Sequence, residues 1–121
     1  MKINKKLKKI ALPEVEWYID ERLFVKQMLM KDAGIYVPKH KHDYDHCSML
    51  ATGSVRVWHD GKRVGDFKAP MPLTVKAGIF HTYMSLEPNT LVYCIHATKD
   101  GDVEVAGEQT EINPAILAEG V

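Results

Sequence analysis

The chain alternates short apolar stretches with turn-forming residues, and this pattern predicts strands rather than helices. The clearest apolar stretch is Arg22–Met30, which ends at a turn-forming sequence over residues 31–34. Further stretches with strand character cover residues 35–37, 47–51, 55–58, 73–75, 81–86 and 91–97. Asp60-Gly61 is a strong signal for a tight hairpin. A helix of one or two turns is expected only at residues 114–119.

Composition and length favour one soluble all-β domain. The chain has 121 residues, 45% of them hydrophobic and 26% charged, and so many short strands in so few residues predict a barrel or sandwich closed on itself. No apolar run is long enough to span a bilayer, and the lysine-rich start lacks the apolar segment of a signal peptide. The 2 cysteines do not make a disulfide framework. We therefore expect a cytoplasmic protein that does not bind membranes.

Charge divides the chain into three parts. Formal net charge is zero, but residues 1–13 contain five of the 16 basic residues and no acidic one. The predicted organisation is a basic arm and lead-in over residues 1–21, a β-barrel over 22–98 and an acidic extension over 99–121. Nucleic-acid binding needs basic residues across the contact face, and here they are gathered in one arm. No nucleic-acid partner is expected.

Histidines carry the main chemical signal. His40, His42 and His46 lie within seven residues, and His81 follows 35 positions after His46. Imidazole is a preferred ligand of late first-row divalent metals, so a cluster of this kind indicates a metal site. Four neutral donors could close a tetrahedral structural site, or could occupy four corners of an octahedron and leave two positions for substrate or oxygen. His59, beside the Asp60-Gly61 turn, and His96 are interpreted as ordinary surface or core residues.

The spacing of these histidines resembles the first sequence motif of the cupin superfamily. That motif runs Gly, five residues, His-x-His, three or four residues, Glu, six residues, Gly. Here Gly34 is followed by five residues, His40-Lys41-His42, three residues, His46, six residues and Gly53. Every spacing fits, and only the glutamate has changed, to His46.

The second cupin motif is matched in part. It runs Gly, five residues, Pro-x-Gly, two residues, His, three residues, Asn. The corresponding positions here are Pro70, Lys76, Gly78, His81 and Ser85. Gly78 and His81 are kept, whereas Pro70, Lys76 and Ser85 depart from the motif. These departures concern the loop geometry rather than the metal ligand.

The resemblance covers roughly residues 22–98 and implies the double-stranded β-helix, or jelly-roll barrel, of the cupins. It implies His40, His42, His46 and His81 as metal ligands, similar to small cupins with an all-histidine manganese site. Manganese or iron is favoured, and nickel, copper or zinc remain open. The function implied is a metal-dependent oxygenase or oxidoreductase acting on a small organic substrate, with O₂ as a second substrate. A homodimer is also implied, paired through the lysine arm or the Arg22–Met30 strand.

Strand alternation selects the residues expected around the metal. Tyr83 lies two positions after His81 and Tyr44 two after His42, so these phenols are the candidate catalytic groups. Val37, Tyr93 and Ile95 are the candidate walls of the binding site. For each tyrosine, plain core packing is an equally good interpretation.

Two other functions stay open at this stage. One keeps the metal without redox chemistry, as an isomerase, decarboxylase or lyase. The other is a non-catalytic cupin that binds a small molecule. Only 33 residues precede Gly34, and part of them is already strand, so a helix-turn-helix regulator is not expected.

Overall fold

Nine strands form the described part of the chain. The computed structural model describes residues 11–20, 23–40 and 46–97, with side chains described throughout except at positions 20, 38–40, 46, 75, 96 and 97. The strands are β1 (Glu14–Asp20), β2 (Leu23–Met30), β3 (Tyr36–His40), β4 (His46–Thr52), β5 (Ser54–His59), β6 (Lys62–Lys68), β7 (Met71–Val75), β8 (His81–Ser85) and β9 (Thr90–Ala97). No helix able to cross a membrane occurs among these described residues.

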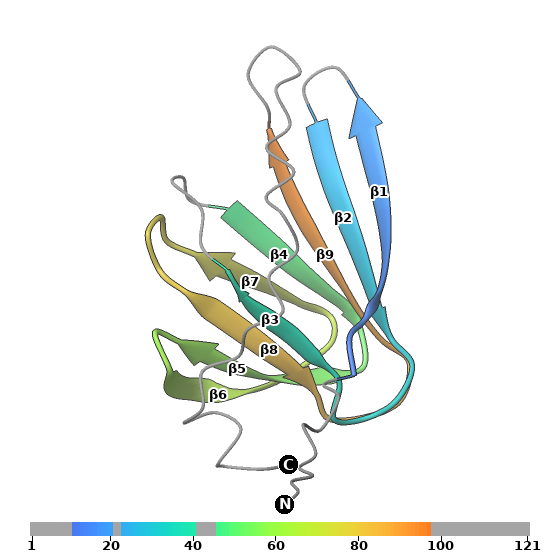
Figure 1. The fold of residues 1–121 in the computed structure, drawn as a ribbon, viewed down its shortest axis with the longest axis vertical. Helices are drawn as coiled ribbons and strands as arrows, with labels where there is room; N and C mark the ends of the chain where they lie inside the picture. Colours follow the sequence, from blue (N-terminus) through green and yellow to red (C-terminus); the bar gives the residue numbers. More distant parts are fainter. Residues whose placement is uncertain (1–10, 21–22, 41–45, 98–121) are drawn as a thin grey trace, which may run out of the picture.

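The strands form two antiparallel sheets that pack face to face (Figure 1). One sheet has five strands in the order β1-β2-β9-β4-β7, and the other has four in the order β3-β8-β5-β6. Each sheet combines strands that are distant in sequence, such as β2 with β9 and β3 with β8. The predicted all-β jelly-roll architecture is confirmed.

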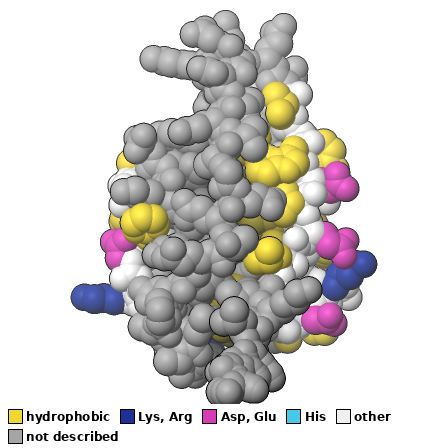
Figure 2. Space-filling model, in the orientation of Figure 1, with side chains coloured by type: hydrophobic (Ala, Val, Ile, Leu, Met, Phe, Trp, Pro, Cys, Tyr) yellow, Lys and Arg dark blue, Asp and Glu magenta, His cyan; other side chains and the backbone are white. Residues whose placement is uncertain are grey.

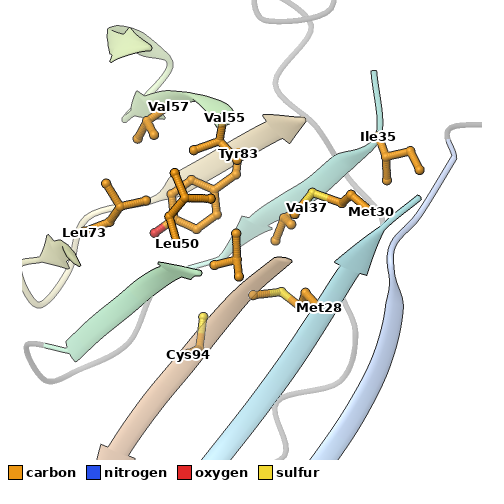
Figure 3. Packing of buried hydrophobic residues seen from close by; sticks show 11 residues of the cluster. Met28, Met30, Ile35, Val37, Leu50, Val55, Val57, Leu73, Tyr83 and Cys94 are labelled. Atoms are coloured by element: carbon orange, nitrogen blue, oxygen red, sulfur yellow. The ribbon is translucent and has the colours of Figure 1, made fainter. Parts of the chain in front are cut away.

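The core lies between the sheets and is built by alternate residues of each strand. Met28 and Met30 of β2, Val55 and Val57 of β5, and Tyr83 of β8 all turn inward and are at most 3% exposed (Figure 3). The other buried members of this cluster are Ile35, Val37, Leu50, Leu73, Val92 and Cys94. Full burial of a large apolar side chain stabilises a fold by about 1.5–3 kcal/mol. On the outside, charged side chains border the visible apolar surface (Figure 2).

Every stretch predicted to be extended coincides with a strand, but two strands were not predicted. β6 carries four charged residues in seven and is mostly exposed, so it lacks the apolar run that marked the other strands. β1 does contain a short apolar run, Trp17–Ile19, between acidic residues, but this run was not predicted to be a strand. β1 pairs with β2 along its whole length, so the five-stranded sheet begins before the predicted boundary at residue 22. The predicted helix at residues 114–119 lies outside the described residues.

The edge of the five-stranded sheet is not where the sequence placed it. The Arg22–Met30 stretch was expected to be able to add to a neighbouring molecule. The structure corrects this expectation, because β2 is hydrogen-bonded to β1 on one side and to β9 on the other. Among the described strands β1 and β7 are at the edges of this sheet, and Tyr18 and Ile19 of β1 are 53% and 58% exposed.

The hairpin between β5 and β6 is tight, as Asp60-Gly61 predicted. His59 pairs with Lys62, which leaves a two-residue turn. Asp60 and Gly61 both have positive φ, 51° and 79°, as a type I′ turn requires. This turn fixes the register of β5 at the end where His59 stands.

Gly53 lies where the chain leaves β4 in one sheet for β5 in the other. Its φ is +79°, and a Cβ atom placed on it would come within 2.7 Å of the Cα of Thr90. The hydroxyl of Thr90 in turn donates a hydrogen bond to the carbonyl of Glu87, 2.9 Å away, so this residue is held in place. Only glycine fits at position 53, for both conformational and steric reasons.

Gly53→Ala is expected to destabilise the protein much more than Gly78→Ala. Gly78 has nearly the same φ, +80°, but a Cβ atom placed on it would have no other atom within 4 Å. The Gly78 variant should therefore lose only the backbone term of about 1–2 kcal/mol. The Gly53 variant should lose a further overpacking term of about 1–3 kcal/mol. Urea unfolding of both variants measures the difference, and equal losses would contradict the steric role of Thr90.

Candidate metal centre

Three strands of the four-stranded sheet bring three histidines into one row. His81 is the first residue of β8, and its register partners are His40 at the end of β3 and His59 at the end of β5. Directly opposed residues of antiparallel strands have Cα atoms about 4.5–5.5 Å apart. The backbone therefore places three histidines side by side at one end of the sandwich.

A fourth histidine starts a strand of the other sheet at the same end. His46 is the first residue of β4 and pairs with Val75, the last residue of β7. The end of β3, the start of β4 and the start of β8 lie together on the left of Figure 1. The fold thus brings the backbones of three predicted ligands, His40, His46 and His81, to one region. The side chains of His40 and His46 lie outside the described residues.

Two further predicted site residues cannot be placed. His42, a predicted ligand, and Tyr44, a predicted catalytic residue, fall within residues 41–45, outside the described residues. This segment connects β3 to β4 and so begins and ends at the histidine-bearing end of the sandwich. Its attachment points are consistent with the predicted position of His42, which stays a prediction.

His81 is held in a fully buried position. The residue has no exposed surface, and every other residue of β8 is also buried. The start of β8 is tied to the end of β5 by two hydrogen bonds. The backbone N–H of Asp60 donates to the carbonyl of Phe80 at 2.7 Å, and the N–H of Phe80 donates to Oδ1 of Asp60 at 3.1 Å. Asp60 follows His59 and Phe80 precedes His81, so these two hydrogen bonds hold the end of β5 against the start of β8.

Tyr83 packs against His81 from the core side. Their ring centroids are 5.2 Å apart at an interplanar angle of 55°. The Tyr83 hydroxyl donates to the Ser48 hydroxyl at 3.1 Å. Burial raises the pKa of Tyr83 well above its ordinary value, so the phenol stays protonated at neutral pH and acts as a donor.

Ser48 extends this polar contact to a thiol. Its hydroxyl lies 3.2 Å from the Sγ of Cys94, and both residues are buried. Burial raises the pKa of the Cys94 thiol, which makes the thiolate unfavourable and the residue unreactive. Cys47 is opposite Ile95 in the register, on the face of β4 turned away from Ser48. The two cysteines therefore face opposite sides of the sheet.

The predicted walls of the binding site separate into two groups. Val37 stands opposite Tyr83 in the β3–β8 register and is only 2% exposed, so it lies in the core beneath the histidine row. Tyr93 and Ile95 are not brought to this site. They alternate with the buried Val92 and Cys94 and so face outward, where the Tyr93 hydroxyl donates to Oε1 of Gln27 at 2.8 Å.

His59 lies on the inner face of its sheet beside His81, a placement that the sequence interpretation missed. In β5 the inward residues are Val55 and Val57, and alternation puts His59 on the same face. The side chain is half-buried, and this desolvation lowers its pKa, against a smaller raising effect of Asp60. The signal was present in the sequence, since Val55, Val57 and His59 follow the two-residue period directly up to the hairpin turn.

The described residues are compatible with a metal site without forming a complete one. No group of three or more His, Cys, Asp or Glu side chains is gathered around a possible ion among the residues with described side chains. Only His81 and His59 of the row have described side chains. The four imidazoles of the predicted ligand set would suit a late first-row divalent ion. The fit rests on His81 being fully buried and on His40 standing directly opposite it.

Solved structures share this architecture. KdgF from a Halomonas species has a TM-score of 0.60 and 17% identity, over 70% of this chain and 77% of its own. An RmlC-like cupin with a double-stranded β-helix fold from Methanocaldococcus jannaschii has 0.60 and 13%, over 80% and 90%. A cupin domain from Bordetella pertussis Tohama I has 0.61 and 18%, over 75% and 98%. No protein-family model and no curated protein matches the sequence.

The chain has the cupin fold. The likeness at these identities concerns the fold alone, and the cupin motifs can now be placed on it. The first motif runs from Gly34 through β3 and β4 to Gly53, and the second ends on β8. In this cupin fold the two motifs meet through the pairing of β3 with β8, which sets His40 of the first against His81 of the second.

The Tyr83–Ser48 contact is expected to be energetically coupled. Tyr83→Phe should cost about 1 kcal/mol, the net value of one buried hydrogen bond. Ser48→Ala should cost about 1–3 kcal/mol, because it leaves the buried phenol without its acceptor. The double variant should therefore be less destabilised than the sum of the two single variants. Urea unfolding of the four proteins checks this, and additive losses would rule out the coupling.

Proposed function

We propose that this chain is a metal-dependent enzyme with the cupin fold and that it acts on a small organic substrate as an oxygenase or oxidoreductase. His40, His42, His46 and His81 would hold the metal. The observation that best supports the proposal is the register of β3 and β8, in which His40 stands opposite the fully buried His81. His46 begins β4 at the same end of the sandwich.

The donor set favours a particular kind of ion and substrate. Imidazoles suit late first-row divalent metals, and the resemblance to all-histidine cupins favours manganese or iron. Four neutral ligands would leave the charge of a divalent ion uncompensated. When bound, such an ion would supply Lewis acidity and attract an anionic oxygen ligand such as an enolate, a diketonate or an α-hydroxy acid.

The surrounding residues would support this chemistry by excluding water. His81 and Tyr83 are both completely buried, and beneath them lies the apolar cluster that includes Val37 and Val57. Electrostatic attraction is stronger in such a low-dielectric setting than in water. The Tyr83 hydroxyl already donates a hydrogen bond to the Ser48 hydroxyl. For Tyr83 we therefore propose a positioning role against the His81 ring, and Tyr44 remains the phenol predicted to contact substrate.

Replacing His81 should abolish metal binding. Protein purified after growth with manganese and iron, and again after reconstitution with each, should hold about one ion per chain when its metal content is measured by plasma mass spectrometry. His81→Ala and the more conservative His81→Gln should both hold almost none, because the buried donor is lost. Glu16→Gln, on the exposed face of β1, is the surface control and should keep the full content. Full metal content in a folded His81 variant would contradict the proposed site.

Oxygen consumption tests the proposed reaction class. The reconstituted protein should consume O₂ with at least one member of a panel of diketones, thiols and alkenes, and His81→Ala should not. The measurement is made with an oxygen electrode, with product identification by mass spectrometry. Turnover with zinc or nickel under anaerobic conditions would select the isomerase, decarboxylase or lyase alternative instead. Full metal binding without turnover of any substrate would favour the non-catalytic alternative.

A further inference from the structure

His59 belongs to the row formed with His81 and His40, although in the sequence it stands beside the Asp60-Gly61 turn. It stands directly opposite His81 in the β5–β8 register, on the side of β8 away from His40. It shares its face with Val55 and Val57, both of which are buried in the core between the sheets. The face that His59 presents is therefore the face that carries the proposed site.

The surrounding contacts hold His59 in this position. The hairpin turn that follows it is only two residues long, and its Asp60 exchanges two hydrogen bonds with Phe80, next to His81. The side chain is half-buried, so its imidazole is desolvated without being sealed into the core. A neutral imidazole offers one donor and one acceptor nitrogen.

We propose that His59 is a ligand-contacting residue of the His81 site, where it hydrogen-bonds a small anionic oxygen-bearing molecule such as an α-hydroxy acid. This inference rests on the proposed function, because it takes the four predicted ligands as the metal set and adds His59 beside them. His81 is completely buried, whereas His59 keeps partial access to solvent. A molecule that reaches His81 from the side of β5 would therefore meet His59.

Cobalt-loaded protein separates this role from a role in metal binding. Cobalt uptake is followed by visible absorption, and the loaded protein is then titrated with glycolate. His59→Ala should keep the cobalt content and bind glycolate about tenfold more weakly, the effect of losing one hydrogen bond to a charged ligand. His59→Gln keeps a donor and should recover part of the affinity. Val64→Ala, an exposed change in the same hairpin, should bind glycolate like the unchanged protein.

The remaining outcomes each decide the inference. Unchanged glycolate affinity in cobalt-loaded His59→Ala would overturn it. Loss of cobalt from folded His59→Ala and His59→Gln would also overturn it, because His59 would then be a metal ligand. If the unchanged protein takes up no cobalt, the proposed function fails, and the metal-free protein decides the inference by NMR. Glycolate-induced shifts of the His59 ring signals would then support it, and unmoved signals would refute it.

Discussion

The backbone register across β3, β8 and β5 is the constraint on which the proposed site depends. Side chains alternate along a strand with a period of two, so a slip of one residue would exchange the faces of His81 and Thr82. The register places His40 and His59 opposite His81, from two strands that are separate in sequence. The hydrogen bonds between these strands therefore determine which histidines can act together.

This register is specified from both faces of the four-stranded sheet. On the inner face Val57 stands opposite Tyr83, in the cluster between the sheets. On the other face Trp58, Met84 and Tyr36 form a second buried cluster, with the Tyr36 and Trp58 ring centroids 6.3 Å apart. A slip of one residue would remove Tyr83 from the first cluster and Met84 from the second. Because both faces of β8 are covered, the strand is buried along its whole length, and His81 begins a strand with little freedom to shift.

The sequence predicted the fold well where it carried apolar runs and turn signals. Asp60-Gly61 predicted its hairpin because a type I′ turn needs positive φ at both positions, and both residues have it. β6 was missed because an exposed edge strand needs few apolar residues, and a pattern search for apolar runs does not detect it. β1 does contain the apolar run Trp17–Ile19, but it was not assigned as a strand. The pairing of these strands could not be deduced from local pattern alone.

Part of the arrangement of the histidines was predictable from the spacing of His40, His46 and His81, whose strands begin or end at one end of the sandwich. The inward direction of β9 could not be deduced, because Tyr93 and Ile95 are as apolar as their neighbours Val92 and Cys94. Only the pairing of β9 with β4, which sets Cys94 opposite the buried Ser48, decides between the two faces. His59 was missed because it stands beside a turn. That position was given more weight than the two-residue alternation of Val55, Val57 and His59 along β5.

Charge is what links the fold to the kind of molecule that the site would accept. The buried polar residues among those described are Ser48, His81, Thr82, Ser85 and Thr90, and none of them is a carboxylate. The cupin motif has a glutamate where this chain has His46, so the predicted ligand set brings no negative charge either. A cation in an apolar interior without a counter-charge is energetically unfavourable. An anionic bound molecule would supply such a charge, which is why we expect an anionic substrate where histidine replaces the glutamate.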